Sequence, residues 1–167
     1  MVTTSVSGHI QEIDFDDGAK KWGSVSNSSL LETGTTKMSK YVKGEFDDLK
    51  IELENRAKTV QYLVLWLDCD REGEAIAEEV ASICLAKNRG LKVFRAHFST
   101  VLMQEISKAL RTLTPINKHM VDAVNARQEI DLRLGAAFTR FMTSRYQRKY
   151  GFQNVISYGP CQFPTLG

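Results

Sequence analysis

Acidic side chains are concentrated in the stretch Asp68–Glu74, which reads Asp-Cys-Asp-Arg-Glu-Gly-Glu. This stretch follows an uninterrupted apolar run, Tyr62–Leu67, and precedes a segment with helical periodicity. Open α/β sheets carry their ligand-binding groups in the loops at the carboxyl ends of buried strands. Alternating carboxylates in such a loop indicate a site for a divalent cation.

Three interpretations of this stretch are open. A magnesium site fits best, because Mg²⁺ takes few protein carboxylates, keeps several waters and usually binds phosphate oxygens. A solvated acidic turn is the simplest alternative, since Glu72 and Glu74 would stabilise the N-terminus of a helix. A calcium loop of the EF-hand type is disfavoured, because such a loop follows an amphipathic helix, whereas Tyr62–Leu67 has the composition of a buried strand. The calcium pattern would use, as positions 1, 3, 5, 6 and 12, Asp68, Asp70, Glu72, Gly73 and Glu79.

The composition is ordinary for a globular protein of this size. The chain has 167 residues, of which 43% are hydrophobic and 25% are charged. No apolar run approaches the roughly 20 residues that a membrane helix needs, and no signal peptide is visible. Cys69, Cys84 and Cys161 are odd in number and widely spaced, which argues against a zinc site or a disulfide framework and favours a reducing compartment.

Positive charge is concentrated toward the C-terminus. Residues 1–60 hold 8 basic and 10 acidic side chains, residues 61–117 hold 7 of each, and residues 118–167 hold 7 basic and 3 acidic. A basic segment together with an acidic metal-type loop is typical of proteins that act on a polyanion such as nucleic acid. A solvated helix face would carry a similar excess, so the charge alone leaves both interpretations open.

The elements around the acidic stretch alternate between strands and helices. Residues 7–15 alternate loosely, as a short strand does, and residues 16–40 are rich in Asp, Gly, Ser and Thr and predict a loop. The patterns beyond them predict a helix at 46–60, a strand at 62–67, a helix at 72–87, a strand at 92–98, and a helix that Ser99 or Thr100 caps and that ends near Leu113. This order predicts the α/β class, with a Rossmann-like parallel sheet and right-handed crossovers.

A long helix is predicted after the break at Pro115. Its pattern runs from about Asn117 to Tyr150. The apolar stripe predicted to face inward consists of Ile130, Leu134, Ala137 and Phe141. The end of the chain, from Ser157, is rich in turn residues. We therefore expect a sheet domain over residues 1–113 and the beginning of a mostly helical second domain over residues 114–167.

Four motifs resemble, in their order along the chain, those of the type IA DNA topoisomerases. They are Ser-Gly-His-Ile at 7–10, the acidic motif Asp68–Ala77, the helical segment Asp122–Phe141 and the turn segment Ile156–Gly167. The acidic motif is similar to that of the family's Toprim domain, and the last two motifs are similar to regions that follow it. Cys69 and the ending Cys-Gln-Phe-Pro-Thr-Leu-Gly most resemble eukaryotic topoisomerase III, in its alpha form. The resemblance implies a Toprim domain over residues 1–113.

The resemblance implies a mechanism that uses Mg²⁺. In this family a tyrosine attacks a phosphodiester of single-stranded DNA, another strand passes through the break, and the break is resealed. By motif match, Asp68, Asp70 and Glu72 would hold the Mg²⁺ ion, which is needed chiefly for rejoining. Arg71 and Arg95 would balance the charge of these carboxylates.

The resemblance also implies contacts with DNA. His9 would approach the phosphate near the cleavage site, and Arg127 and Asp131 would lie near the DNA backbone. Without the family, Arg127 and Asp131 are simply one helical turn apart and form a local pair. The turn residues would contact DNA through backbone N–H groups and the Gln162 side chain, whereas without the family they form an ordinary Gly-Pro turn. This turn comprises Ser157, Tyr158, Gly159, Pro160, Cys161 and Gln162.

Parts of the family's machinery are expected to lie outside this chain. The first Toprim strand, with a Glu and a Lys close to the scissile phosphate, would precede residue 1. The nucleophilic tyrosine, in a Tyr-Pro-Arg-Thr context, would lie beyond residue 167. Tyr158 precedes Gly-Pro and is not expected to be that nucleophile. The chain alone is therefore expected to be inactive.

The resemblance further implies single-stranded DNA as the substrate, helicase and accessory subunits as partners, a nuclear location and no membrane. Two other classes are open. A Toprim nuclease or primase would use the same carboxylates but would need neither the turn segment nor the helix of Arg127 and Asp131. A non-catalytic module would bind DNA or a partner protein.

Overall fold

The computed structural model describes residues 2–166, apart from the side chain of Phe163. In chain order its elements are β1 (Gln11–Phe15), α1 (Asp17–Lys20), β2 (Met38–Val42), the 3-10 helix η1 (Gly44–Phe46), α2 (Asp47–Ala57), β3 (Tyr62–Trp66), α3 (Arg71–Lys87), β4 (Lys92–Ala96), α4 (Met103–Arg111), α5 (Lys118–Tyr150) and α6 (Gln162–Leu166). They form two compact units. The first comprises Met1–Glu12 and Tyr41–Asn125, and the second comprises Ile13–Lys40 and Ala126–Gly167.

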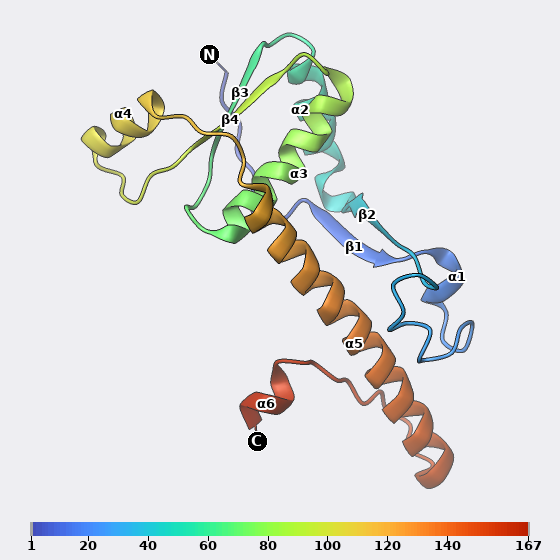
Figure 1. Cartoon of the computed structure of the whole chain (residues 1–167). Coiled ribbons are helices and arrows are strands. Elements are labelled where there is room, and N and C mark those ends of the chain that lie inside the picture. The colour runs from blue at the N-terminus through green and yellow to red at the C-terminus, as the bar shows by residue number, and fades with distance from the viewer. Residues whose placement is uncertain (1, 167) are drawn as a thin grey trace. The chain divides into compact units, whose positions relative to one another are not determined.

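The first unit is built on a parallel pair of strands. β3 and β4 are hydrogen-bonded in parallel, with Tyr62 opposite Lys92 and Trp66 opposite Ala96. The crossover between them is α3, because parallel strands need a long connection that returns the chain to the same edge. Figure 1 shows α2 and α3 running beside each other in this unit, and the two helices pack closely. The prediction of an α/β fold with a parallel sheet and flanking helices is confirmed.

The hydrophobic core of this unit lies between the sheet and the two helices. Leu65 of β3 packs with Leu53 and Ala57 of α2 and with Val80 and Cys84 of α3, and all five are buried. Residues three and four apart in α3 lie on one face of the helix, so this face is buried along its length. This packing fixes the start of α3 next to the carboxyl end of β3, where the acidic stretch lies.

Burial gives the three cysteines different reactivities. Cys84 is buried, and burial raises the pKa of its thiol, so less thiolate is present at any given pH. Cys69 and Cys161 are exposed. We expect iodoacetamide to alkylate Cys69 and Cys161 in the folded chain, and Cys84 only after unfolding in guanidinium, as peptide mass spectrometry will show. Equal alkylation rates of Cys84 in buffer and in denaturant would contradict this expectation.

The second unit is organised by the C-terminal part of α5. Two arginines of this helix are buried, and their guanidinium groups donate to carbonyl groups of the segment between β1 and β2. Arg140 donates to Ala19 at 2.9 Å and to Lys20 at 3.0 Å. Burial lowers the pKa of the Arg140 guanidinium, and the charge of Asp14 opposes that shift. The other buried arginine, Arg133, makes a similar set of bonds.

No helix among residues 2–166 is long and apolar enough to cross a bilayer.

The predicted inner stripe of α5 is partly wrong. Ile130 and Phe141 are 53% and 49% exposed. The residues that are buried along this part of the helix are Arg133, Ala137, Arg140 and Thr143. The prediction failed because it was built from apolar residues alone, whereas here arginine side chains are buried and carbonyl groups of an irregular segment satisfy their N–H donors.

Three other local predictions also differ from the structure. The segment predicted as a loop at 16–40 contains α1 and the beginning of β2. α4 begins at Met103, and its N-cap is Leu102, so neither Ser99 nor Thr100 caps it. The turn-rich end of the chain contains the short helix α6.

Candidate functional site

The acidic stretch forms a short loop at the carboxyl end of β3. Asp68 and Asp70 are exposed in this loop, and Asp70 is the N-cap of α3. One carboxylate oxygen of Asp70 accepts a hydrogen bond from the backbone N–H of Gly73 at 2.7 Å, which satisfies one of the free donors in the first turn of the helix. Asp68 forms no hydrogen bond or ion pair through its side chain with any described residue. The loop therefore presents one free carboxylate and one that is half engaged.

Gly73 allows the loop to fold tightly onto the first turn of α3. A Cβ atom added at this position would lie 2.1 Å from the carbonyl oxygen of Asp68 and 3.2 Å from its nitrogen. Real Cβ contacts are never this short, so no side chain can be accommodated here without moving the backbone. The glycine at this place in the motif is required by the close approach of the Asp68 peptide.

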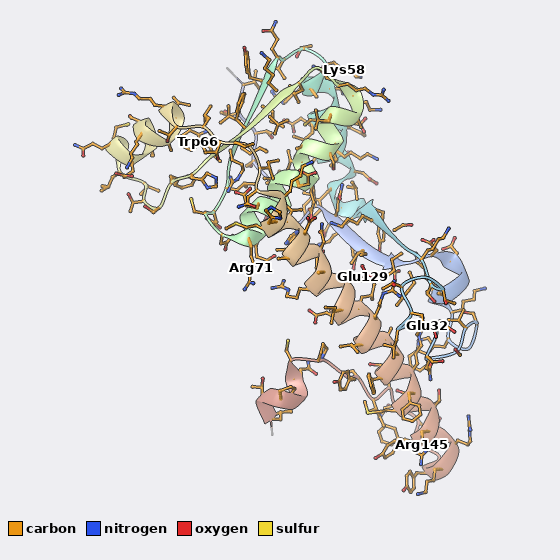
Figure 2. All side chains as sticks on the ribbon, in the orientation of Figure 1. Glu32, Lys58, Trp66, Arg71, Glu129 and Arg145 are labelled. Atoms are coloured by element: carbon orange, nitrogen blue, oxygen red, sulfur yellow. The ribbon has the colours of Figure 1, made fainter. Side chains whose placement is uncertain are left out.

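Two residues predicted to balance charge lie in different environments. Arg71 is exposed, and Figure 2 shows it at the start of α3. Arg95 is buried in β4, and its Nε donates to Oε1 of Glu74 at 2.8 Å. The charge of Arg95 is thus paired with Glu74. Glu74, which the sequence assigned only to a possible helix-capping role, is buried and has an internal partner.

His9 connects the N-terminal segment to α3. Its Nδ1 lies 2.7 Å from Oε1 of Glu79, and its Nε2 lies 3.1 Å from Oε2 of Glu72. Only the doubly protonated imidazolium can donate to both carboxylates, because a neutral ring has one N–H. Glu72, a predicted metal ligand, is therefore in contact with His9, a predicted DNA contact.

Glu79 is a site residue whose role the sequence missed. It is 4% exposed, and its Oε2 accepts hydrogen bonds from the backbone N–H groups of Ile10 and Gln11 at 3.0 and 3.1 Å. Together with the contact to His9, these bonds fix the segment that carries the imidazole. A signal was present, because Glu79 lies three residues after Ile76 and four before Ile83, spacings that place it on the same helical face as these apolar residues.

Replacing Glu79 with glutamine is expected to lower the free energy of unfolding by about 1.5 kcal/mol. A glutamine amide offers one acceptor oxygen, whereas the carboxylate uses both oxygens to accept from different donors. Glu78→Gln removes the same charge from a neighbouring position and should change stability by less than about 0.5 kcal/mol. Urea unfolding of both variants checks the difference, and equal midpoints would argue against a structural role for Glu79.

The donor set fits a hard cation that needs few protein ligands. No group of three or more His, Cys, Asp or Glu side chains converges on a common point within residues 2–166. The calcium-loop interpretation is not supported, because its twelfth position, Glu79, is buried and holds the backbone of Ile10 and Gln11. Mg²⁺ needs only one or two carboxylates when waters and phosphate oxygens complete its shell, and Asp68 and Asp70 can supply these.

Cys69 lies between the two aspartates and is held by the segment after β4. Its Sγ accepts from the backbone N–H of Phe98 at 2.9 Å and lies 2.8 Å from the carbonyl oxygen of Phe98. A hollow of about 230 Å³ lies beside this contact, and its lining includes Cys69, His97, Lys108 and Thr112. The loop is thus fixed from β4 as well as from α3.

Within the second unit, the predicted DNA-contacting pair lies on α5. Arg127 is exposed and Asp131 is half-buried, one helical turn apart. The basic side chains of residues 118–167 are divided in their roles. Two are internal, Arg133 and Arg140, whereas the exposed ones are Lys118, Arg127, Arg145, Arg148 and Lys149. The positive charge available to a polyanion is therefore smaller than the sequence count.

The turn segment packs along α5 through its first residues. The backbone N–H of Tyr158 donates to Oγ1 of Thr139 at 2.8 Å, and the Tyr158 ring packs at a tilt against that of Phe138, with 4.9 Å between centroids. Ser157 is exposed, Gly159 and Pro160 are half-buried, and Cys161 and Gln162 are exposed at the start of α6. The beginning of the turn is thus anchored while its end is accessible.

Comparisons with known proteins agree with these features. Residues 1–101 match the Toprim domain family, and residues 115–167 match the DNA topoisomerase family. DNA topoisomerase 3-alpha of Arabidopsis thaliana is 45% identical over 174 residues, which cover 100% of this chain and 18% of that protein. DNA topoisomerase 3-alpha of Homo sapiens is 45% identical over 170 residues, covering 100% of the chain and 17% of that protein. DNA topoisomerase 3-beta of Arabidopsis thaliana is also 45% identical, over 98% of the chain.

This degree of similarity extends over the whole chain, although the chain spans less than a fifth of the length of these relatives. The Toprim match covers the acidic loop, the histidine segment and the parallel strands, and the second match covers α5 and the turn segment. The chain therefore belongs to the type IA DNA topoisomerase family, in its eukaryotic topoisomerase 3 branch.

Proposed function

We propose that this chain forms the metal-binding part of a topoisomerase that relaxes or decatenates DNA. The reaction would cleave one strand, pass another through the break and religate the first through a tyrosyl-phosphate intermediate. The observation that carries the proposal is the acidic loop, where Asp68 and Asp70 are exposed at the carboxyl end of a parallel strand. This is the place where open α/β sheets bind their ligands.

In this proposal Asp68 and Asp70, with Glu72, hold Mg²⁺. When bound, Mg²⁺ would neutralise charge on a phosphoryl group and favour in-line displacement, chiefly during religation. The chain's own residues prepare the loop for this role. Gly73 and Asp70 fix the backbone at the start of α3, and His9 keeps the Glu72 carboxylate next to the loop.

Single-stranded DNA is the proposed substrate. Phosphate groups would meet His9 in the first unit, and in the second unit they would meet the exposed Arg127, with Asp131 beside it, and the turn of residues 157–162. Exposed cationic side chains and free backbone N–H groups are the usual contacts to phosphate. A nuclear location and association with a helicase and accessory subunits complete the proposal.

A nuclease or primase that uses a Toprim domain is less well supported. Such an enzyme would need the acidic loop but not the segment that follows it. The match of residues 115–167 to the DNA topoisomerase family includes both α5 and the turn segment. This match supports strand cleavage and religation over hydrolysis or nucleotidyl transfer.

The proposal is tested with Asp68→Asn and Asp70→Asn together, in a topoisomerase 3 that contains this chain. The rate at which the cleaved DNA strand is rejoined should fall by about 100-fold or more, because the charges that hold the cation are lost. Binding of single-stranded DNA should be retained. Asp47→Asn with Asp48→Asn, an exposed acidic pair at the start of α2, is the matched control and should leave religation unchanged. Full religation by the loop variant would reject the proposal.

We also propose that the 167-residue chain alone neither cleaves nor relaxes DNA and binds Mg²⁺ weakly. The three carboxylates of Asp68, Asp70 and Glu72, without a substrate phosphate, make an incomplete shell for this ion. Incubation of the purified chain with negatively supercoiled plasmid and Mg²⁺ should leave the plasmid topology unchanged. Measurable relaxation, or tight Mg²⁺ binding in a calorimetric titration, would contradict this part of the proposal.

A further inference from the structure

The guanidinium group of Arg95 is completely buried below the acidic loop. Arg95 is 0% exposed, although long cationic side chains are almost never fully buried unless they are paired. Its Nη1 donates to the carbonyl of Leu65 at 3.0 Å, and its Nη2 donates to the carbonyl of Asp68 at 2.9 Å. Both nitrogens also lie 3.4 Å from the carbonyl of Leu67. The group thus binds the backbone that leads from β3 into the loop.

Glu74 supplies the opposite charge and ties this centre to the segment before α5. Its Oε1 accepts from Nε of Arg95 at 2.8 Å, and its Oε2 accepts from the backbone N–H of Asn117 at 2.8 Å. The backbone of Arg95 is itself paired with Thr114, in both directions, at 2.7 and 3.0 Å. Every charged atom of the pair therefore has a partner, and the pair is held from several elements of the first unit.

Two contacts fix the position of the Asp68 peptide. Arg95 binds its carbonyl oxygen, and the Cα of Gly73 lies so close to the same oxygen that no Cβ fits. The position of a side chain follows from the position and orientation of its peptide. The Asp68 carboxylate, which has no partner among the described residues, therefore owes its placement to these backbone contacts.

We propose that Arg95, with Glu74 as its counter-charge, is the positioning residue of the metal loop. It does not contact the cation itself. It fixes the Asp68 peptide and thereby the position of the Asp68 carboxylate that would bind the cation. This inference rests on the proposed function, since it assumes that the acidic loop, which Arg95 holds in place, binds Mg²⁺. Lysine cannot replace it, because an ammonium group lacks the planar fork that reaches two carbonyls and a carboxylate at once.

The second unit offers a matched control. Arg133 has the same arrangement, since its Nε donates to Glu129 at 2.8 Å and its other nitrogens donate to the carbonyls of Leu30 and Thr36 at 2.8 and 3.0 Å. It is 6% exposed. Arg133→Lys therefore removes a similar guanidinium from a carbonyl cluster that carries no acidic loop.

The test is a Mn²⁺ titration of the 167-residue chain, read by electron paramagnetic resonance of free and bound Mn²⁺. The chain is compared with Arg95→Lys, Arg133→Lys and Asp68→Asn, at a temperature where circular dichroism shows each to be folded. Arg95→Lys should weaken Mn²⁺ binding by about 10-fold or more, as loss of a group that orients a metal ligand does. Arg133→Lys should lower the unfolding temperature and leave the Mn²⁺ affinity unchanged. A loss of stability alone cannot produce this difference.

The outcomes separate the inference from the function on which it rests. If Asp68→Asn leaves Mn²⁺ binding unchanged, or if the unaltered chain binds no Mn²⁺, the proposed metal function fails and the inference fails with it. If Asp68→Asn weakens binding and Arg95→Lys does not, the inference alone is overturned. Should Arg95→Lys fail to fold, the isosteric Glu74→Gln takes its place, with a severalfold weakening expected and an unchanged affinity overturning the inference.

Discussion

Replacing Glu74 with leucine is expected to lower the free energy of unfolding of this chain by about 3–5 kcal/mol. Glu74 and Arg95 are 1% and 0% exposed, so the variant leaves a guanidinium charge in the interior without its counter-charge. It also leaves the backbone N–H of Asn117 without an acceptor. The cost comes from the isolated charge more than from the lost attraction, because an uncompensated buried charge cannot be hydrated.

Urea unfolding, followed by circular dichroism, measures this effect. Glu52→Leu is the matched control, since Glu52 pairs with Arg56 one turn away on α2 and both side chains are more than 40% exposed. Its loss should be no more than about 0.5 kcal/mol, because water screens an exposed pair. Glu74→Leu combined with Arg95→Met should recover part of the stability, since it removes the isolated charge. Equal losses of unfolding free energy for Glu74→Leu and Glu52→Leu would show that the Glu74–Arg95 pair contributes no more to stability than an exposed ion pair does.

Replacing Gly73 with alanine is expected to lower the free energy of unfolding by about 3 kcal/mol, at the upper end of the cost of overpacking. The atom that the new Cβ would meet, at 2.1 Å, is a backbone oxygen and not the end of a flexible side chain. Relief therefore requires the Asp68 peptide to move, which breaks its hydrogen bond with Arg95. The same movement displaces the Asp68 carboxylate, so Mn²⁺ binding should weaken together with stability.

Gly90→Ala is the control for this substitution. A Cβ at Gly90 would lie 3.5 Å from the side-chain oxygen of Asn88, which is ordinary contact. Its effect should be within about 0.5 kcal/mol. Thermal unfolding and the Mn²⁺ titration are measured on both variants. A Gly73→Ala chain with unchanged stability and unchanged Mn²⁺ affinity would mean that the Asp68 peptide does not pack tightly against Gly73.

Local patterns predicted the elements that carry the acidic loop. The apolar run at 62–67 became β3, and the periodic segment after it became α3, each within one residue of its predicted bounds. The helix was predicted because α3 buries one face against the core, so its hydrophobic periodicity reports its secondary structure. The strand was predicted from its short apolar and aromatic composition, although its burial was overestimated, because in β3 only Leu65 is buried and Tyr62 and Trp66 are exposed. The strand β2 was missed, because Met38–Val42 is exposed over its centre and lacks a clear alternation of apolar and polar residues.

Long-range contacts were beyond the reach of these patterns. His9 meets Glu72 and Glu79 across more than 60 residues of sequence, and nothing in the spacing of these residues predicts the contact. The buried arginines of α5 were missed for a related reason. A guanidinium group is buried only where several acceptors surround it, and here those acceptors are the backbone carbonyls of Leu30, Thr36 and Ala19. Every residue carries a backbone carbonyl, so the sequence does not reveal which of them accept these hydrogen bonds.

By itself, the sequence determined the family, the α/β class and the order of the elements around the loop, and it singled out the carboxylates that are proposed to bind a cation. These follow from residue types and short spacings. Only the tertiary structure decided which acidic side chains are exposed and which are paired inside the protein. Glu74 and Glu79 are as acidic as Asp68 and Asp70, but burial against Arg95, His9 and backbone N–H groups commits them to the interior. The role of a carboxylate depends on the groups that it contacts, and the tertiary structure determines those contacts.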